Sequence, residues 1–257
     1  MRVTVLGSAA SHAGKGEACA GHYVEGGDSR VLLDCGNGVL ANLYKVADPY
    51  ELDAVFITHN HPDHYCDLYS MQAMLRYAPS GPVPAMPVFM PAELFERMQL
   101  LLSERGAEEF REAFSFAALE DGVPVEVGLM TVTPHLVDHT DPTFSPRVEA
   151  DGGTLVYTAD TAPGARASAA AAGADLLLAE GTLPEEYAGV APHLTAIQAG
   201  ELAREAGASH LVLVHVWPTN DRELMAKTAA AAFKGRADVA AELDSFDVVP
   251  RSEGTAQ

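Results

Sequence analysis

The run Thr58-His59-Asn60-His61-Pro62-Asp63-His64 decides how this chain is interpreted. It places three imidazoles and a carboxylate within six positions, directly after the apolar stretch Leu52-Asp53-Ala54-Val55-Phe56-Ile57. A packed core does not accept so many polar groups without partners. Imidazole and carboxylate groups together suit zinc, iron or manganese. The run therefore predicts a metal site at the end of a buried strand.

Three more candidate ligands follow apolar runs further along the chain. His139 lies in a turn after the strand predicted near residues 131–133, Asp160 follows the run 155–159, and His215 follows the run 210–214. Polar residues at strand ends lie at a sheet edge, where loops converge. We therefore expect these three side chains to join the His59 run, with His135 as the competitor of His139.

Length and composition bound the class of protein. The 257 residues suffice for one domain with a large core, which we predict over residues 1–250, with a flexible polar tail over 251–257. The formal net charge of -20 opposes binding to a long nucleic acid, because phosphate backbones require a basic surface. Three cysteines without CxxC spacing argue against a disulfide framework or a structural zinc site.

The sequence also bounds the compartment that we expect. No stretch reaches the roughly 18 uninterrupted apolar residues that a membrane helix needs. Residues 1–7 have the alternation of a strand and not the pattern of a secretory signal. We therefore expect a cytoplasmic protein that does not contact the membrane.

Strand and helix patterns cover most of the chain. Strands are predicted at 3–6, 21–25, 30–34, 55–58, 88–90, 123–127, 130–134, 143–150, 154–158, 175–179 and 211–216. Helices are predicted at 39–46, 67–77, 92–106, 107–114, 165–172, 194–206 and 221–234. Strands dominate the start of each half and helices follow. The expected fold is α/β (α+β type), a four-layer αββα sandwich of two mixed β-sheets flanked by helices.

The order of the candidate ligands points to a family. The pattern His59-x-His61-x-Asp63-His64, followed by His139, Asp160 and His215, resembles the metallo-β-lactamase-fold hydrolases. The resemblance extends over nearly the whole chain, from Leu6-Gly7-Ser8 to the strand before His215. It is specific for the fold and poorly specific for the substrate. The αββα sandwich of that family agrees with the predicted layers.

The resemblance implies a role for each candidate ligand. One metal ion is held by His59, His61 and His139, the other by Asp63, His64 and His215, and Asp160 bridges the two. The implied cofactors are two divalent metal ions, zinc before manganese or iron. His139 is preferred over His135 because the following Asp141-Pro142-Thr143-Phe144 and Arg147 resemble the stretch after the ligand in ribonuclease Z-like members.

Three further motifs resemble the ribonuclease Z-like branch and its small phosphodiesterase relatives. They are Tyr157-Thr158-Ala159-Asp160-Thr161, Leu178-Ala179-Glu180-Gly181-Thr182 and His193-Leu194-Thr195-Ala196. In that branch the late histidine lies beside the metals and donates a proton, which implies a catalytic role for His193. Asp63 would also orient the nucleophile, Glu180 would orient a ligand imidazole, and Trp217 would form part of the site wall.

These features predict a binuclear metal-dependent hydrolase that acts on a small phosphodiester, a cyclic nucleotide being one candidate. Two cations would lower the pKa of a shared water for attack on phosphorus. The first alternative is a lactone, thioester or other carboxylic ester as substrate. A second is transfer-RNA 3′ processing, disfavoured by the acidity and by the lack of the Gly- and Pro-rich arm of that branch. A third is a non-catalytic metabolite-binding or pathway accessory protein.

The expected partner is a small-molecule substrate. A homodimer is compatible with the resemblance, although the sequence identifies no interface.

Overall fold

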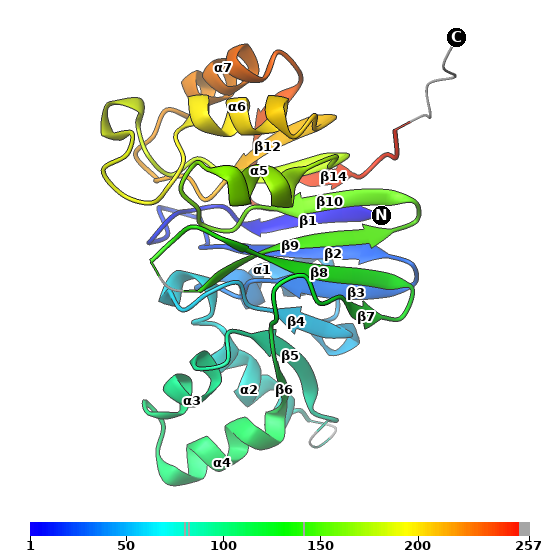
Figure 1. The fold of residues 1–257 in the computed structure, drawn as a ribbon. Helices are drawn as coiled ribbons and strands as arrows, with labels where there is room; N and C mark the ends of the chain where they lie inside the picture. Colours follow the sequence, from blue (N-terminus) through cyan, green and yellow to red (C-terminus); the bar gives the residue numbers. More distant parts are fainter. Residues whose placement is uncertain (80, 82, 141, 252–257) are drawn as a thin grey trace.

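Two β-sheets and the helices on their outer faces make up the fold (Figure 1). The computed structural model describes residues 1–257 except 80, 82, 141 and 252–257. Its strands are β1 Arg2–Gly7, β2 Gly21–Gly26, β3 Ser29–Leu33, β4 Ala54–Phe56, β5 Met86–Met90, β6 Phe114–Ala118, β7 Val125–Val127, β8 Met130–Val137, β9 Thr143–Ala150, β10 Gly153–Tyr157, β11 Leu176–Glu180, β12 His210–Val214, β13 Ala237–Val239 and β14 Ser245–Asp247. Its α-helices are α1 Val39–Val46, α2 Leu68–Arg76, α3 Leu94–Gln99, α4 Glu104–Ala113, α5 Ala165–Ala171, α6 Ala196–Glu205 and α7 Arg222–Phe233.

Both sheets mix parallel and antiparallel pairs, as predicted. The first sheet has the order β14-β1-β2-β3-β4-β5-β6, in which β3 to β6 run parallel and the other pairs are antiparallel. The second has the order β13-β12-β11-β10-β9-β8-β7, in which β10 to β13 run parallel and β7 to β10 are antiparallel.

Three apolar clusters separate the layers. The first, with Val5, Val24, Leu155 and Val212, lies between the two sheets. The second packs α1 to α4 on the first sheet, and includes Leu32, Leu43, Met71 and Phe110. The third packs α5 to α7 on the second sheet, and includes Leu177, Ala199 and Phe233. In Figure 1, α5 to α7 accordingly gather at the top and α2 to α4 at the bottom. The predicted four-layer αββα sandwich is confirmed.

Residues 92–118 differ from the prediction of helices at 92–106 and 107–114. The first helix ends at Gln99, and the Ser103 hydroxyl accepts a hydrogen bond from the Gly106 amide at 3.1 Å, so that a separate helix begins at Glu104. Such a cap stabilises a new helix start. The second helix ends at Ala113, because the following residues form β6 beside β5. The short strands β13 and β14 were also not predicted, since three residues carry too little periodicity.

The loops that carry the predicted ligands converge at one edge of the sandwich. They follow β4, β8, β10 and β12. The amide of Phe144, at the start of β9, donates to the carbonyl of Thr58 at 3.0 Å and joins the two sheets at this edge. Gly36 allows the turn after β3 to approach the ligand loop, because a Cβ there would lie 1.9 Å from the Asp63 carbonyl oxygen. The fold therefore brings distant parts of the sequence to one place.

The predicted flexible tail covers residues 251–257, of which 252–257 lie outside the described residues. The Arg251 amide donates to Asp175 at 3.0 Å, and its guanidinium donates to the Ser209 hydroxyl at 2.8 Å and to the Ala174 carbonyl at 3.0 Å. In the part of the chain that the structure describes, no helix has the length and apolar character needed to cross a bilayer.

Candidate metal centre

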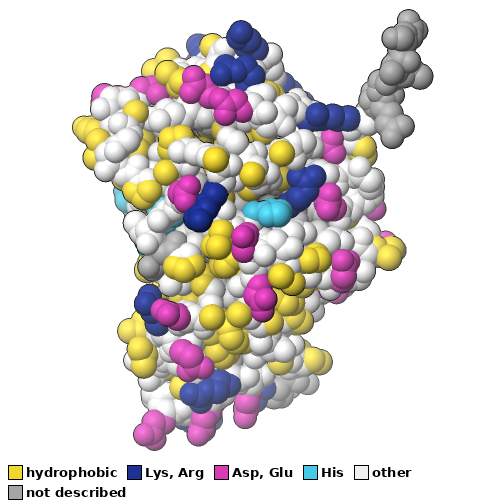
Figure 2. Space-filling view, viewed as in Figure 1, with side chains coloured by type: hydrophobic (Ala, Val, Ile, Leu, Met, Phe, Trp, Pro, Cys, Tyr) yellow, Lys and Arg dark blue, Asp and Glu magenta, His cyan; other side chains and the backbone are white. Residues whose placement is uncertain are grey.

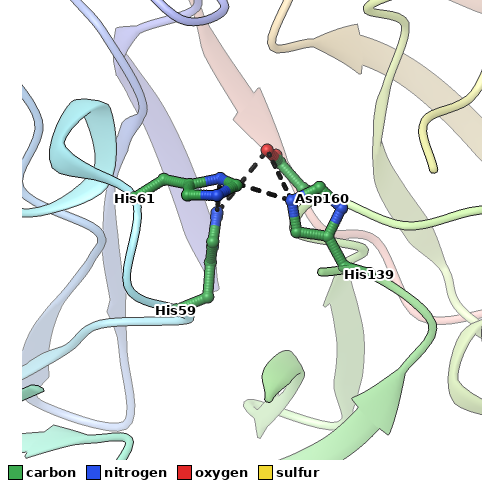
Figure 3. A group of neighbouring side chains, drawn as sticks. All are labelled: His59, His61, His139 and Asp160. Atoms are coloured by element: carbon green, nitrogen blue, oxygen red, sulfur yellow. Dashed lines mark hydrogen bonds and ion pairs between the residues drawn. The ribbon is translucent and has the colours of Figure 1, made fainter. Parts of the chain in front are cut away.

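Four side chains form a first group of ligand atoms, drawn in Figure 3. His59, His61, His139 and Asp160 each offer one atom, and these atoms lie within 4.8 Å of one another. His61 Nδ1 lies 3.0 Å from His59 Nε2 and 3.3 Å from His139 Nε2. The rings come from two separate loops and point toward one another. This group can hold one metal ion.

A second group lies next to the first. Asp63, His64 and His215 also bring their ligand atoms within 4.8 Å of one another. His215 Nε2 lies 3.2 Å from His64 Nε2 and 3.3 Å from Asp63 Oδ2. The Asp63 carboxylate is held in turn by the amide of Ser11, which donates to Oδ2 at 2.8 Å.

Asp160 lies between the two groups. Its Oδ2 is 3.6 Å from His59 Nε2 and 3.8 Å from His139 Nε2, which belong to the first group. Its Oδ1 is 3.5 Å from His64 Nε2 and 3.4 Å from His215 Nδ1, which belong to the second. The two oxygens of this carboxylate therefore face different sets of imidazoles.

The donor atoms fit divalent cations. Three imidazole nitrogens converge in the first group, and protons cannot satisfy all their lone pairs at once. Burial holds the pKa of His59 well below its usual range, so that this ring is neutral and free to donate a lone pair. Asp160 Oδ1 is buried and accepts no hydrogen bond from the described residues. A cation at this position would satisfy both the imidazoles and the carboxylate.

Each of the five imidazoles in these groups is oriented by a neighbour at a ring nitrogen. The contacts are His59 Nδ1 with Thr58 Oγ1 at 3.0 Å, His61 Nε2 with Thr140 Oγ1 at 3.3 Å, His64 Nδ1 with Asp34 Oδ2 at 2.7 Å, His139 Nδ1 with the Pro192 carbonyl at 3.0 Å, and His215 Nδ1 with Thr182 Oγ1 at 2.8 Å. Such partners fix the tautomer and the ring direction of metal-binding histidines.

The sequence analysis did not identify Asp34 as a site residue and placed it only at the end of the strand predicted at 30–34. Its buried carboxylate accepts hydrogen bonds from His64, from the Thr58 amide at 2.8 Å and hydroxyl at 3.0 Å, and from the Tyr157 hydroxyl at 3.1 Å. Asp34 directly follows the apolar run 31–33. The same signal that identified Asp160 and His215, a polar residue after an apolar strand, could have identified it.

We expect Asp34→Asn to weaken metal binding by about tenfold to a hundredfold. Asparagine tolerates the positive φ of 61° at this position, but its neutral amide stabilises the His64 imidazole less than a carboxylate does. Competition with a chromogenic chelator measures the affinity. Asp53→Asn is a matched control, because the exposed Asp53 carboxylate accepts a hydrogen bond from the Arg30 amide at 2.7 Å and belongs to neither ligand group. Equal affinity in both variants would contradict the role of Asp34.

The backbone is strained where the site is built. Asp34, Ala159 and His215 have φ angles of 61°, 52° and 49°, in the left-handed region that side chains with a Cβ disfavour by about 1–2 kcal/mol. Ala159 directly precedes Asp160, so that its backbone conformation directs the Asp160 carboxylate. His215 is itself a candidate ligand. Such strain concentrates at functional sites, where the surrounding structure holds it.

His193 and Glu180 form a pair beside the two groups. His193 Nδ1 lies 3.0 and 3.1 Å from the two Glu180 oxygens, and the ring is grouped with Asp160 and His215. Burial lowers the pKa of His193, but the hydrogen bond and charge of Glu180 outweigh it and raise the pKa to about 9. The fully buried Glu180 also accepts from the Thr161 amide at 2.6 Å. Glu180 thus orients the imidazole of His193.

The structure distinguishes the two competing histidines and places the remaining candidate. His135 lies inside β8, opposite Ser145 of β9, and belongs to neither group. β8 continues to Val137, which explains why the turn begins only just before His139.

Trp217 is half-buried just after β12, and its carbonyl accepts a hydrogen bond from the Asn220 amide at 2.9 Å. Its role in the site wall stays a prediction.

Known proteins are similar to this chain in sequence and in fold. The model of a beta-lactamase superfamily domain matches residues 29–216. An uncharacterized protein of Mycobacterium leprae is 31% identical, with 96% of this chain and 89% of that protein covered. A ribonuclease Z of Mycobacterium bovis is 27% identical, with 98% and 99% covered. The crystal structure of the metallo-beta-lactamase fold protein YhfI from Bacillus subtilis has a TM-score of 0.85 and 27% identity, with 96% and 99% covered.

The family match covers the His59 run, His139, Asp160 and His215, which are the residues that build the two groups. The His and Asp groups are capable of binding metal, and the fold is that of YhfI. The chain therefore belongs to the beta-lactamase superfamily, as a metallo-β-lactamase-fold hydrolase of the ribonuclease Z-like branch.

Proposed function

We propose that this protein is a binuclear metal-dependent phosphodiesterase that cleaves small phosphodiesters, with cyclic nucleotides as candidates. His59, His61 and His139 would hold one divalent ion, and Asp63, His64 and His215 the other. The position of Asp160 carries the proposal, because its two carboxylate oxygens face the two sets separately. Imidazole nitrogens together with carboxylate oxygens favour zinc, with manganese and iron as alternatives.

The choice of a small phosphodiester has two supports. A ribonuclease Z is similar to this chain along nearly its whole length, and its name denotes cleavage of phosphodiester bonds in RNA. Here, however, the net charge is -20. Figure 2 shows Lys and Arg side chains in small separate groups among Asp and Glu, with no continuous basic surface on this face. A long nucleic acid requires such a surface, so that a small diester is the better substrate.

Each residue of the site would have its own role in hydrolysis. Divalent ions held by the two ligand groups would lower the pKa of a water molecule and would neutralise charge on the phosphoryl group. Asp63, held by the Ser11 amide, would orient the attacking oxygen. His193, anchored through Nδ1 by Glu180, would present Nε2 to the leaving oxygen and protonate it.

Hydrolysis of bis-p-nitrophenyl phosphate by the zinc-loaded protein tests this proposal. We expect release of nitrophenol that depends on added metal. If protein shown to hold two ions per chain releases none, and instead opens lactones or thioesters, the phosphodiesterase proposal is wrong and the carboxylic ester alternative replaces it.

We expect His193→Gln to affect substrates according to their leaving group. Loss of a proton donor costs typically about 10²–10⁴-fold when the leaving oxygen needs the proton. The decrease in kcat should therefore be large for a cyclic nucleotide, which expels an alkoxide, and small for bis-p-nitrophenyl phosphate, which expels a stabilised phenolate. Steady-state kinetics on both substrates measure the difference. An equal decrease on both would show that His193 acts on metal binding or folding instead.

A further inference from the structure

A hollow of about 300 Å³ has Asn60, the residue between His59 and His61, in its lining, and its volume lies within the ~300–1,000 Å³ range of small-molecule sites. Its apolar walls are Pro91, Ala92, Leu119, Pro142 and Phe144. A second hollow of about 510 Å³, between α7 and the β13 and β14 strands, contains none of the candidate ligands in its lining. Of these two hollows, the first is therefore the one whose lining includes a neighbour of the candidate metal ligands.

Two lining residues connect this hollow to the loop that carries His59 and His61. Asn60, which forms part of its wall, stands between the candidate ligands His59 and His61. The amide of Leu119 donates to the Met90 carbonyl at 3.0 Å, which fixes this wall at the end of β5. Phe144 is fixed by the hydrogen bond of its amide to Thr58. Pro91, Leu119 and Phe144 thus fix part of the wall at strand ends of both sheets, and the other lining residues lie in the adjoining loops.

The chemistry of the lining selects the group that the hollow accepts. Its aliphatic and aromatic side chains favour an apolar, flat group. The charged side chain among its lining residues is Glu93, which lies on the rim and pairs with Arg97 at 3.1 Å. This ion pair leaves no net positive charge at the rim that would attract a second phosphate or another anion.

We propose that this hollow binds the aromatic group of the substrate, such as a nucleobase, while the phosphoryl group lies at the metals. The inference rests on the proposed phosphodiesterase function and names the class of substituent that the diester carries. Because strand ends hold part of its wall in place, the hollow would fix the position of the aromatic ring. The ring would in turn fix the position of the phosphoryl group.

Two phosphonates that the protein cannot hydrolyse test the subsite without turnover. Phenylphosphonate and methylphosphonate share the anion and differ in the ring. Calorimetry with zinc-loaded protein should give about tenfold tighter binding of phenylphosphonate, because the ring leaves water for an apolar hollow. Ala92→Trp should fill the hollow from its exposed rim and abolish the difference, whereas Ala92→Ser should keep it. Phe144→Leu, which removes the aromatic wall and keeps an apolar side chain, should reduce the difference.

The outcomes separate this inference from the proposed function. Equal binding of the two phosphonates by the wild-type protein overturns the subsite, as does a preference for phenylphosphonate that survives Ala92→Trp and Phe144→Leu. Either result leaves the phosphodiesterase proposal standing if bis-p-nitrophenyl phosphate is hydrolysed. Absence of both hydrolysis and phosphonate binding overturns the two together.

Discussion

Replacing Asp160 by Asn is expected to lower kcat/KM for a phosphodiester by about a thousandfold or more. Loss of a single charge-stabilising group in an active site already costs about 10²–10³-fold, and this residue serves both ligand groups. Burial opposes ionisation of Asp160, but His215 and His64 outweigh it and hold the pKa of this carboxyl well below its usual range. The neutral amide would therefore leave two sets of imidazoles without their shared anion.

The measurement combines steady-state kinetics with metal content determined by elemental analysis. Asp175→Asn is the matched control, because Asp175 is also buried but lies just before β11, where its carboxylate accepts from the Thr154 amide at 2.9 Å. This control should keep its metal and its activity even if it unfolds more easily. An Asp160→Asn variant that keeps two ions and full activity would refute the binuclear model.

Removal of the metal ions is expected to abolish hydrolysis and to lower the stability of the fold. A ligand that binds only the folded state stabilises it by about 2.7–4.1 kcal/mol at 100 to 1,000 times its Kd. In addition, the side chains of His59 and His64 are fully buried beside other ligand groups, where lone pairs and charges need a cation. The melting temperature should fall on chelation and recover when zinc is added back.

The Asp160→Asn variant provides the comparison for this experiment. With one shared ligand missing, its melting temperature should respond less to chelation than that of the wild-type protein. If the wild-type melting temperature does not change after loss of all bound metal, the groups do not couple ion binding to folding.

The sequence allowed the layers and the ligand groups to be predicted because one simple pattern carries both. An apolar strand that ends in a histidine or a carboxylate occurs at His59, Asp160 and His215, and parallel strands bring such ends to one edge. The strands before these three residues are strongly apolar, and each predicted strand overlaps the observed one. His139 was distinguished from His135 by resemblance alone, since both follow apolar residues of the same strand.

Other features could not be predicted from local pattern. β14 pairs with β1, so that residues near the two ends of the chain meet, and nothing in the three residues 245–247 indicates this partner. Asp34 acquires its importance only through the hydrogen bonds that His64, Thr58 and Tyr157 donate to it across both sheets. The proximity of the apolar hollow to the ligands likewise depends on tertiary packing of strand ends.

The candidate ligands are spread along the chain from His59 to His215, and this spread bears on how the protein matures. The two groups draw on loops of both sheets, and the first group already requires His139 and Asp160. During synthesis, a ribosome has therefore completed most of the polypeptide before either group can be whole. Assembly of either ligand group is accordingly a late event, so that an ion would bind only to a nearly finished fold.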